Sequence, residues 1–207
     1  MSDTSGLPAL RPAPRRPAIP RPRVDAVRRL LPARRTYLKA LHGAMIPLTG
    51  WFMIATPDFV RGLFGPKGAA INSDIALVFV ALALLWSGDY FARGLAGRPG
   101  PKLPSHLRTF HRRLHKTLVW LLFLVPVGGF LLGLTSERLL LAGGWLPIAP
   151  PLGLARANDV MGLLHRVEFY ALGALVVLHA AFHVWRHVRL RDNALRIMAP
   201  KVLHRFL

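Results

Sequence analysis

Residues 161–185 read MGLLHRVEFYALGALVVLHAAFHVW, an apolar segment of membrane-spanning length with a histidine toward each end. His165 and His179 are fourteen positions apart, which on an α-helix places them on nearly the same face. A rise of about 1.5 Å per residue separates them by about 21 Å along the axis, one toward each side of a bilayer core of roughly 30 Å. Ionisable side chains are rare at that depth, so we expect these imidazoles to ligate haem iron.

Three more segments have the length and composition of membrane spans, at about 37–56, 74–93 and 117–135. They lack the polar stripe at intervals of three and four residues that a soluble helical bundle shows. The chain of 207 residues is also 53% hydrophobic. We therefore predict an all-α fold, an integral-membrane up-down four-helix bundle within a transmembrane domain over 36–190.

The basic residues alternate between the two sides of these spans. The net charge is +19, and ten of the 28 Lys and Arg residues precede or open the first span. Seven more lie in the second connection and six follow or close the last span, whereas the first and third connections hold two each. This distribution follows the positive-inside rule and predicts that both termini are cytoplasmic. The basic excess therefore indicates contact with membrane lipid and not with nucleic acid.

The two ends of the chain differ from the spans in composition. Residues 1–35 are rich in Pro and Arg, so we expect a disordered cytoplasmic tail that rests near anionic lipid or docks a partner protein. Residues 191–207 are typical of a short amphipathic tail on the cytoplasmic surface. The outer connection, 136–158, is too short and too broken by Gly and Pro to cross, and we expect it at the membrane interface.

The chain has no cysteine. This excludes disulfides, cysteine-ligated iron–sulfur clusters and haem attached through thioethers. Any haem is therefore held non-covalently, as in b-type cytochromes.

His42 lies in the first span at a depth that matches His179 in the last. It is about five residues inside the cytoplasmic start of its span, and His179 is about six residues inside the cytoplasmic end of its own. Antiparallel neighbours with these offsets would bring the two imidazoles to one depth, which is the geometry of a bis-histidine iron site. The alternative is a hydrogen bond between two neutral histidines, worth about 1 kcal/mol.

His165 has no equivalent partner, because no histidine lies between His42 and His106. We therefore expect one haem b, at His42 and His179, and leave a second haem at His165 open. Met53 is the only conventional alternative ligand near that depth. His165 could instead hold a five-coordinate iron, or form a hydrogen bond with the outer connection.

The remaining histidines and Glu168 are not expected to ligate iron. His183 and His187 continue the face of His179 and are expected at headgroup level or bonded to a haem propionate. Glu168 is expected to pair with Arg166 or with the outer connection. No embedded carboxylate pair, G-x-S-x-G motif or phosphate-binding glycine loop is present, which argues against hydrolase chemistry. Three histidines in the basic segments are expected to be solvated: His106, His111 and His204.

The run HRVEFYALGALVVLHAAFHVWRHVRLRDNALRIMAP, residues 165–200, resembles the bacterial cytochrome b561 family, which are four-helix membrane cytochromes b. The stretch HKTLVWLLFLVPVGG, residues 115–129, resembles the third span of that family, and the resemblance covers roughly 37–201. It implies an inner haem ligated by His42 and His179, and an outer haem at His165 with a histidine near the start of span two. This chain has Ile75 or its neighbours there. The resemblance also implies that His115 contacts quinone or a haem propionate.

We therefore expect a membrane-bound b-type haem electron-transfer protein of the bacterial inner membrane that exchanges electrons with the quinone pool. One alternative is a haem-poor or degenerate b561-like subunit or scaffold of a larger respiratory or photosynthetic complex. Another is a membrane anchor for a peripheral dehydrogenase. Both an electron carrier alone and a quinol-linked oxidoreductase are compatible with this expectation.

Overall fold

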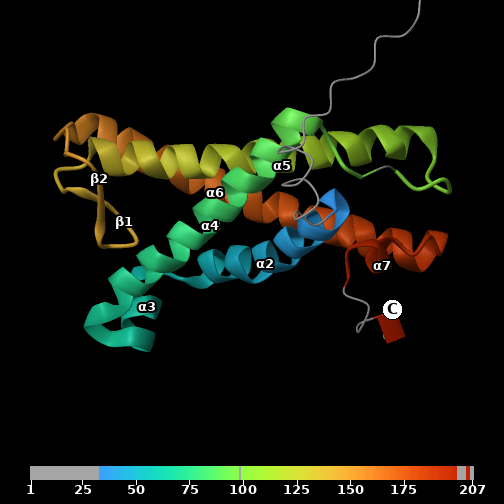
Figure 1. Ribbon diagram of the computed structural model, residues 1–207, viewed down its shortest axis with the longest axis horizontal. Helices are drawn as coiled ribbons and strands as arrows, with labels where there is room; N and C mark the ends of the chain where they lie inside the picture. The colour runs from blue at the N-terminus through green and yellow to red at the C-terminus, as the bar shows by residue number, and fades with distance from the viewer. Residues whose placement is uncertain (1–32, 98, 200–203, 206–207) are drawn as a thin grey trace, which may run out of the picture. The chain divides into compact units, whose positions relative to one another are not determined.

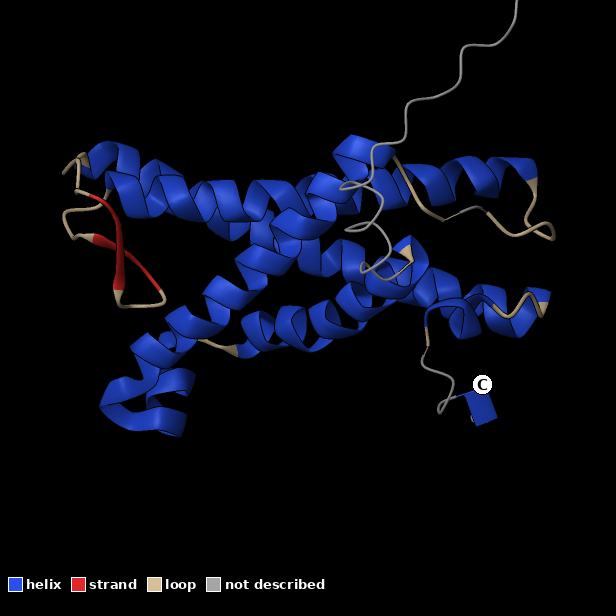
Figure 2. Cartoon of the chain, in the orientation of Figure 1, coloured by secondary structure: helices blue, strands red, loops and turns tan. Residues whose placement is uncertain are grey.

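The computed structural model describes residues 33–97, 99–199 and 204–205, and this part of the chain is mostly helical (Figures 1 and 2). The expected tail over 1–35 lies outside the described residues apart from 33–35, and the expected tail over 191–207 is described only at 191–199 and 204–205. The elements in chain order are α2 (Arg34–Ile54), α3 (Pro57–Phe64), η1 (Gly65–Lys67), α4 (Gly68–Arg93), α5 (Ser105–Thr135), β1 (Leu140–Ala142), β2 (Leu146–Ala149), α6 (Ala155–Trp185), η2 (Arg186–Leu190) and α7 (Ala194–Met198).

Three helical runs are long and apolar enough to cross a membrane: Pro57–Arg93, Ser105–Thr135 and Ala155–Leu190. Many of their large apolar side chains face outward; Leu85 and Val177, for example, are 63% and 68% exposed. Apolar surface spread over whole helices is stable only in a non-aqueous environment, which indicates a membrane protein. The helix formed by the first predicted span, α2, is not one of these three runs.

The pairing of α5 with α6 positions most of the histidines. His111 on α5 contacts His183, His115 contacts His179, and Gly129 lies against His165. Residue numbers therefore fall along α6 as they rise along α5, so the two helices are antiparallel.

Helix α2 is fastened to α4 by a buried carboxylate. Asp89 near the end of α4 accepts hydrogen bonds from Arg34 at the start of α2, from Nε at 2.9 Å and from Nη2 at 2.6 Å. The Tyr37 hydroxyl and the Arg93 guanidinium donate to the other carboxylate oxygen. These contacts fix the position of the N-terminal turns of α2 against α4. They thereby help to position His42, which lies two turns further along α2.

Aromatic rings fill the space between the helices further from this end. Phe52, Phe79 and Phe169 form a three-ring cluster, with centroids 5.6 to 5.8 Å apart, that joins α2, α4 and α6. Beyond it, Trp51 Nε1 donates to the side-chain oxygen of Asn72 at 2.9 Å. The contacts at both ends of α2 show that it runs antiparallel to α4.

Several expectations about the elements need correction. The connection after α5 contains an antiparallel hairpin of β1 and β2, which the all-α prediction did not include. Gly143 and Gly144 make its turn with φ of +60° and +73°, a conformation that favours glycine. The first connection contains α3 and η1. The second and third predicted spans are parts of longer helices, which begin at Gly68 and Ser105. The first turns of α5 are polar and basic and therefore fall outside an apolar window.

Candidate functional site

The structure brings His42 and His179 together from α2 and α6. Their ring centroids are 6.3 Å apart, with an interplanar angle of 56°. Two imidazoles on opposite sides of one metal, with metal–nitrogen distances near 2 Å, have centroids about 6 Å apart. Nδ1 of His179 is buried and has no hydrogen-bond partner among the described residues. The spacing and this unpaired nitrogen therefore fit the bis-histidine site expected from the sequence.

The local sequence of α2 explains why His42 faces inward. The buried positions of this helix are Leu38, Leu41, Met45 and Thr49, which recur every three or four residues. His42 falls within this stripe, so the face that packs on the other helices also carries the imidazole.

Further rings surround the pair. Trp86 on α4 lies 5.8 Å from the ring of His42. His115 meets His179 edge to face at 4.7 Å, so the residue expected to lie near the inner haem contacts one of the proposed ligands. His183, one turn beyond His179 on α6, is 4.5 Å from it.

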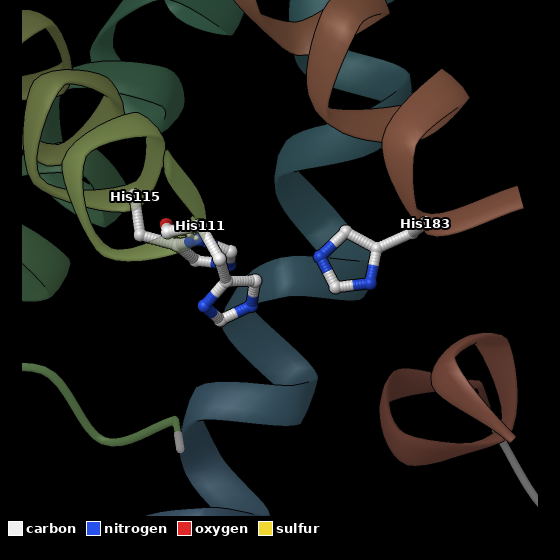
Figure 3. Close-up of side chains that lie close together, drawn as sticks. All are labelled: His111, His115 and His183. Carbon is white, nitrogen blue, oxygen red and sulfur yellow. Dashed lines mark hydrogen bonds between the residues drawn. The ribbon is translucent and has the colours of Figure 1, made fainter. Parts of the chain in front are cut away.

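A second group of histidines lies beside this pair. His111 and His115 come from successive turns of α5 and His183 comes from α6, and their rings point toward one another (Figure 3). One ligand nitrogen from each residue lies within 4.8 Å of the other two, an arrangement that could hold a metal ion. No protein-family model matches this chain, and no curated protein matches it.

The expectation that His111 is solvated is wrong. Its side chain is buried, with 5% of the residue exposed, and it contacts His115, Phe182 and His183. Arg112 and Arg113 beside it are exposed, which is why the segment looks uniformly basic in the sequence. The signal that could have identified the group is the spacing of four residues in both HRRLH and HAAFH, since residues i and i+4 share a helix face.

A buried ion pair lies at the same end of α6. Arg186 is 1% exposed, and its Nη2 lies 2.6 Å from the carboxylate of Asp192. It begins the π-helical turn η2, a local widening of the helix that occurs often at functional sites. Arg191 and Asn193 adopt φ of +47° and +57°, so the chain turns back and brings Asp192 to the guanidinium.

His165 lies in a different environment, against a pair of glycines. A Cβ added at Gly128 or Gly129 of α5 would crowd Glu168 or His165. Nδ1 of His165 is 3.8 Å from Glu168 Oε2, and neither atom has a hydrogen-bond partner in the described part of the chain. Glu168 thus lies beside His165 and the α5 backbone, where Gly128 leaves it room. Among the described residues it forms no ion pair with Arg166 or with the outer connection, the two partners expected from the sequence.

Among the residues that the structure describes, no second ligand of the expected kinds lies beside His165. Its ring contact in the described chain is with Phe169, at 6.1 Å. The sulfur of Met53 packs on Gly173, eight residues further along α6, which is about 12 Å at 1.5 Å per residue. Near the start of α4, the Asp74 carboxylate lies next to the hairpin turn at Gly143.

Proposed function

We propose that this chain is an integral-membrane b-type cytochrome of the bacterial inner membrane that exchanges electrons with the quinone pool. The observation that carries the proposal is the 6.3 Å separation of the His42 and His179 rings on the antiparallel helices α2 and α6. The resemblance of the sequence to the cytochrome b561 family agrees with it, because that family uses histidines in these two spans as ligands.

In this proposal His42 and His179 are the axial ligands of one haem b. When bound, the haem supplies a one-electron couple between ferrous and ferric iron. The protein supplies two neutral imidazoles and an apolar surrounding that excludes water. Met45, Leu118 and Leu122, which belong to the buried cluster of the helix core, contribute to that surrounding. A low-dielectric setting of this kind and nearby cations are means by which a protein sets the potential of iron.

The proposed topology is an up-down bundle of α2, α4, α5 and α6 with both termini in the cytoplasm. The antiparallel contacts of α2 with α4 and of α5 with α6 support it. Basic residues gather at the helix ends nearest the histidine groups, including Arg34 and Arg93 at one pair of helices and Arg186 at the other. The positive-inside rule assigns this end to the cytoplasm.

The environment of His165 favours a single haem. The family resemblance implies a second iron ligand beside His165. In the structure, the Glu168 carboxylate and the glycines of α5 at 128–129 lie beside it instead. The same feature favours one alternative function, in which the chain is a haem-poor subunit or a membrane anchor within a larger redox complex. In that case, a peripheral dehydrogenase or other partner would deliver the electrons.

The experiment that separates these functions is a haem count on the full-length chain in detergent or lipid nanodiscs. A pyridine haemochrome assay should give one b haem per chain. His42→Ala and His179→Ala should each abolish it, whereas His165→Ala and the exposed control His106→Ala should retain it. A colourless wild-type protein would reject the electron carrier and leave the subunit or anchor.

A further inference from the structure

We propose that His111, His115 and His183 form a second, non-haem site that binds a divalent transition metal of the Zn²⁺ class. The three residues lie on α5 and α6, which pack against each other, and their ligand nitrogens lie within 4.8 Å of one another. This site is separate from the proposed haem ligands, so its metal binding does not depend on the proposed function.

The hydrogen bonds of the group leave ligand nitrogens free. Nδ1 of His115 lies 2.7 Å from the carbonyl oxygen of His111. A carbonyl only accepts, so this Nδ1 carries the proton and Nε2 keeps its lone pair for a metal. A backbone carbonyl that holds the second ring nitrogen is a common support for a metal-bound histidine.

The other two residues supply an independent observation. Nδ1 of His111 and Nε2 of His183 are buried and have no hydrogen-bond partner among the residues described. Buried polar atoms are nearly always paired, so two unpaired nitrogens from facing helices in one cluster point to a missing partner. A single metal ion would satisfy both, after side-chain rotations that bring the nitrogens to about 3.4 Å from one another.

The donor set selects the class of metal. Imidazole suits Zn²⁺, Cu²⁺ and Ni²⁺, whereas Mg²⁺ and Ca²⁺ require oxygen ligands that this group lacks. Three histidines with a fourth position open to water are a usual coordination for Zn²⁺. Arg186, whose charge acts on all three histidines, is paired with Asp192 at 2.6 Å, so its positive charge is offset locally and opposes a cation less.

One consequence rests on the proposed function. His179 borders the metal site, with ring centroids 4.7 Å from His115 and 4.5 Å from His183. A dication held there would lie close to the proposed haem ligand and would favour the reduced, less positive iron. Bound Zn²⁺ should therefore raise the midpoint potential of the haem in the wild-type chain and leave it unchanged in His183→Ala.

The binding test uses full-length protein in detergent, purified through a tag that contains no histidine. The protein is equilibrated with Zn²⁺, passed through a desalting column with a weak chelator, and analysed for zinc and iron per chain by mass spectrometry. We expect one zinc in the wild type, and its loss in His111→Ala and in His183→Ala with iron retained. The exposed control His106→Ala, on the same helix as His111, should keep both metals.

A reciprocal variant separates this site from the proposed haem site. His179→Ala should lose iron and keep zinc, and retained elution volume on gel filtration would show that each variant is folded. If a variant to Ala fails this check, His183→Gln replaces it, because Gln preserves much of the volume but is a poor zinc ligand. Zinc that survives both His111→Ala and His183→Ala, zinc lost only with His179, or no retained zinc in the wild type would each overturn the proposal.

Discussion

Replacing Asp89 with Asn should release the start of α2, because this carboxylate joins the helix to α4. Its side chain is 4% exposed and lies within bonding distance of two guanidinium groups. Asn keeps the shape but leaves the charges of Arg34 and Arg93 without a counter-ion. Helix α2 is not among the helical runs apolar enough to cross a membrane on composition alone, so it should depend more than the others on this polar contact.

The size of the effect follows from how buried the partners are. Removing one member of a fully buried ion pair costs about 3–5 kcal/mol. Here the side chains of Arg34 and Arg93 are 27% and 51% exposed, so water compensates part of the loss. We expect about 2 kcal/mol, which corresponds to a roughly 30-fold rise in the fraction of molecules with the start of α2 open.

The chain contains no cysteine, so a single introduced thiol reports on this opening. Leu38, one residue after Tyr37, is 6% exposed. In a Leu38→Cys background, Asp89→Asn should raise the rate of maleimide labelling by about 30-fold. The control Asp58→Asn, which changes an exposed carboxylate on α3, should leave the rate unchanged. Equal labelling rates in the Asp89 variant and the control would refute the role assigned to this carboxylate.

Two other predictions concern α5 and α6. Gly128→Ala places a methyl group against the Glu168 carboxylate and should cost about 1–3 kcal/mol in a denaturant titration followed by circular dichroism. The control Gly88→Ala meets nothing within 4 Å and should be neutral or stabilising; equal losses would contradict the close contact. Arg186→Gln and Asp192→Asn should each cost about 3–5 kcal/mol, because both side chains are only 2% exposed. The double variant should cost clearly less than their sum in a double-mutant cycle, and full additivity would show that the pair is not coupled.

The helices could be predicted from the sequence where apolar runs are long and uninterrupted. The third and fourth predicted spans lie within α5 and α6 for that reason. The predicted C-terminal ends, Thr135 and Trp185, are confirmed, but the starts of the two helices could not be predicted, because hydropathy does not detect a helix whose first turns are polar. The stretch from Ser105 to Lys116 is rich in basic residues, yet it continues α5 without a break.

The meeting of His42 and His179 was predictable from depth alone. Each lies a similar distance from the basic end of its helix, so antiparallel packing brings them together. The position of His111 was not predictable in this way, since it depends on how α5 rotates about its axis. Packing against α6 sets that rotation, which turns His111 inward while its neighbour Arg112 stays exposed.

The environment of His165 shows the same limit. The sequence contains the glycine pair at 128–129, but it does not show which side chains of α6 pack on these glycines. The register of α5 against α6 decides this. Only the packed structure shows that Glu168 and His165 share this space.

The most direct test of the central claim, that His42 and His179 bind one haem from opposite sides, is electron paramagnetic resonance of the oxidised full-length protein. Haem held by these two residues should give a low-spin ferric signal typical of two imidazole ligands, and this signal should disappear in His42→Ala and in His179→Ala. A high-spin signal in the wild type, or a low-spin signal that survives either substitution, would contradict it.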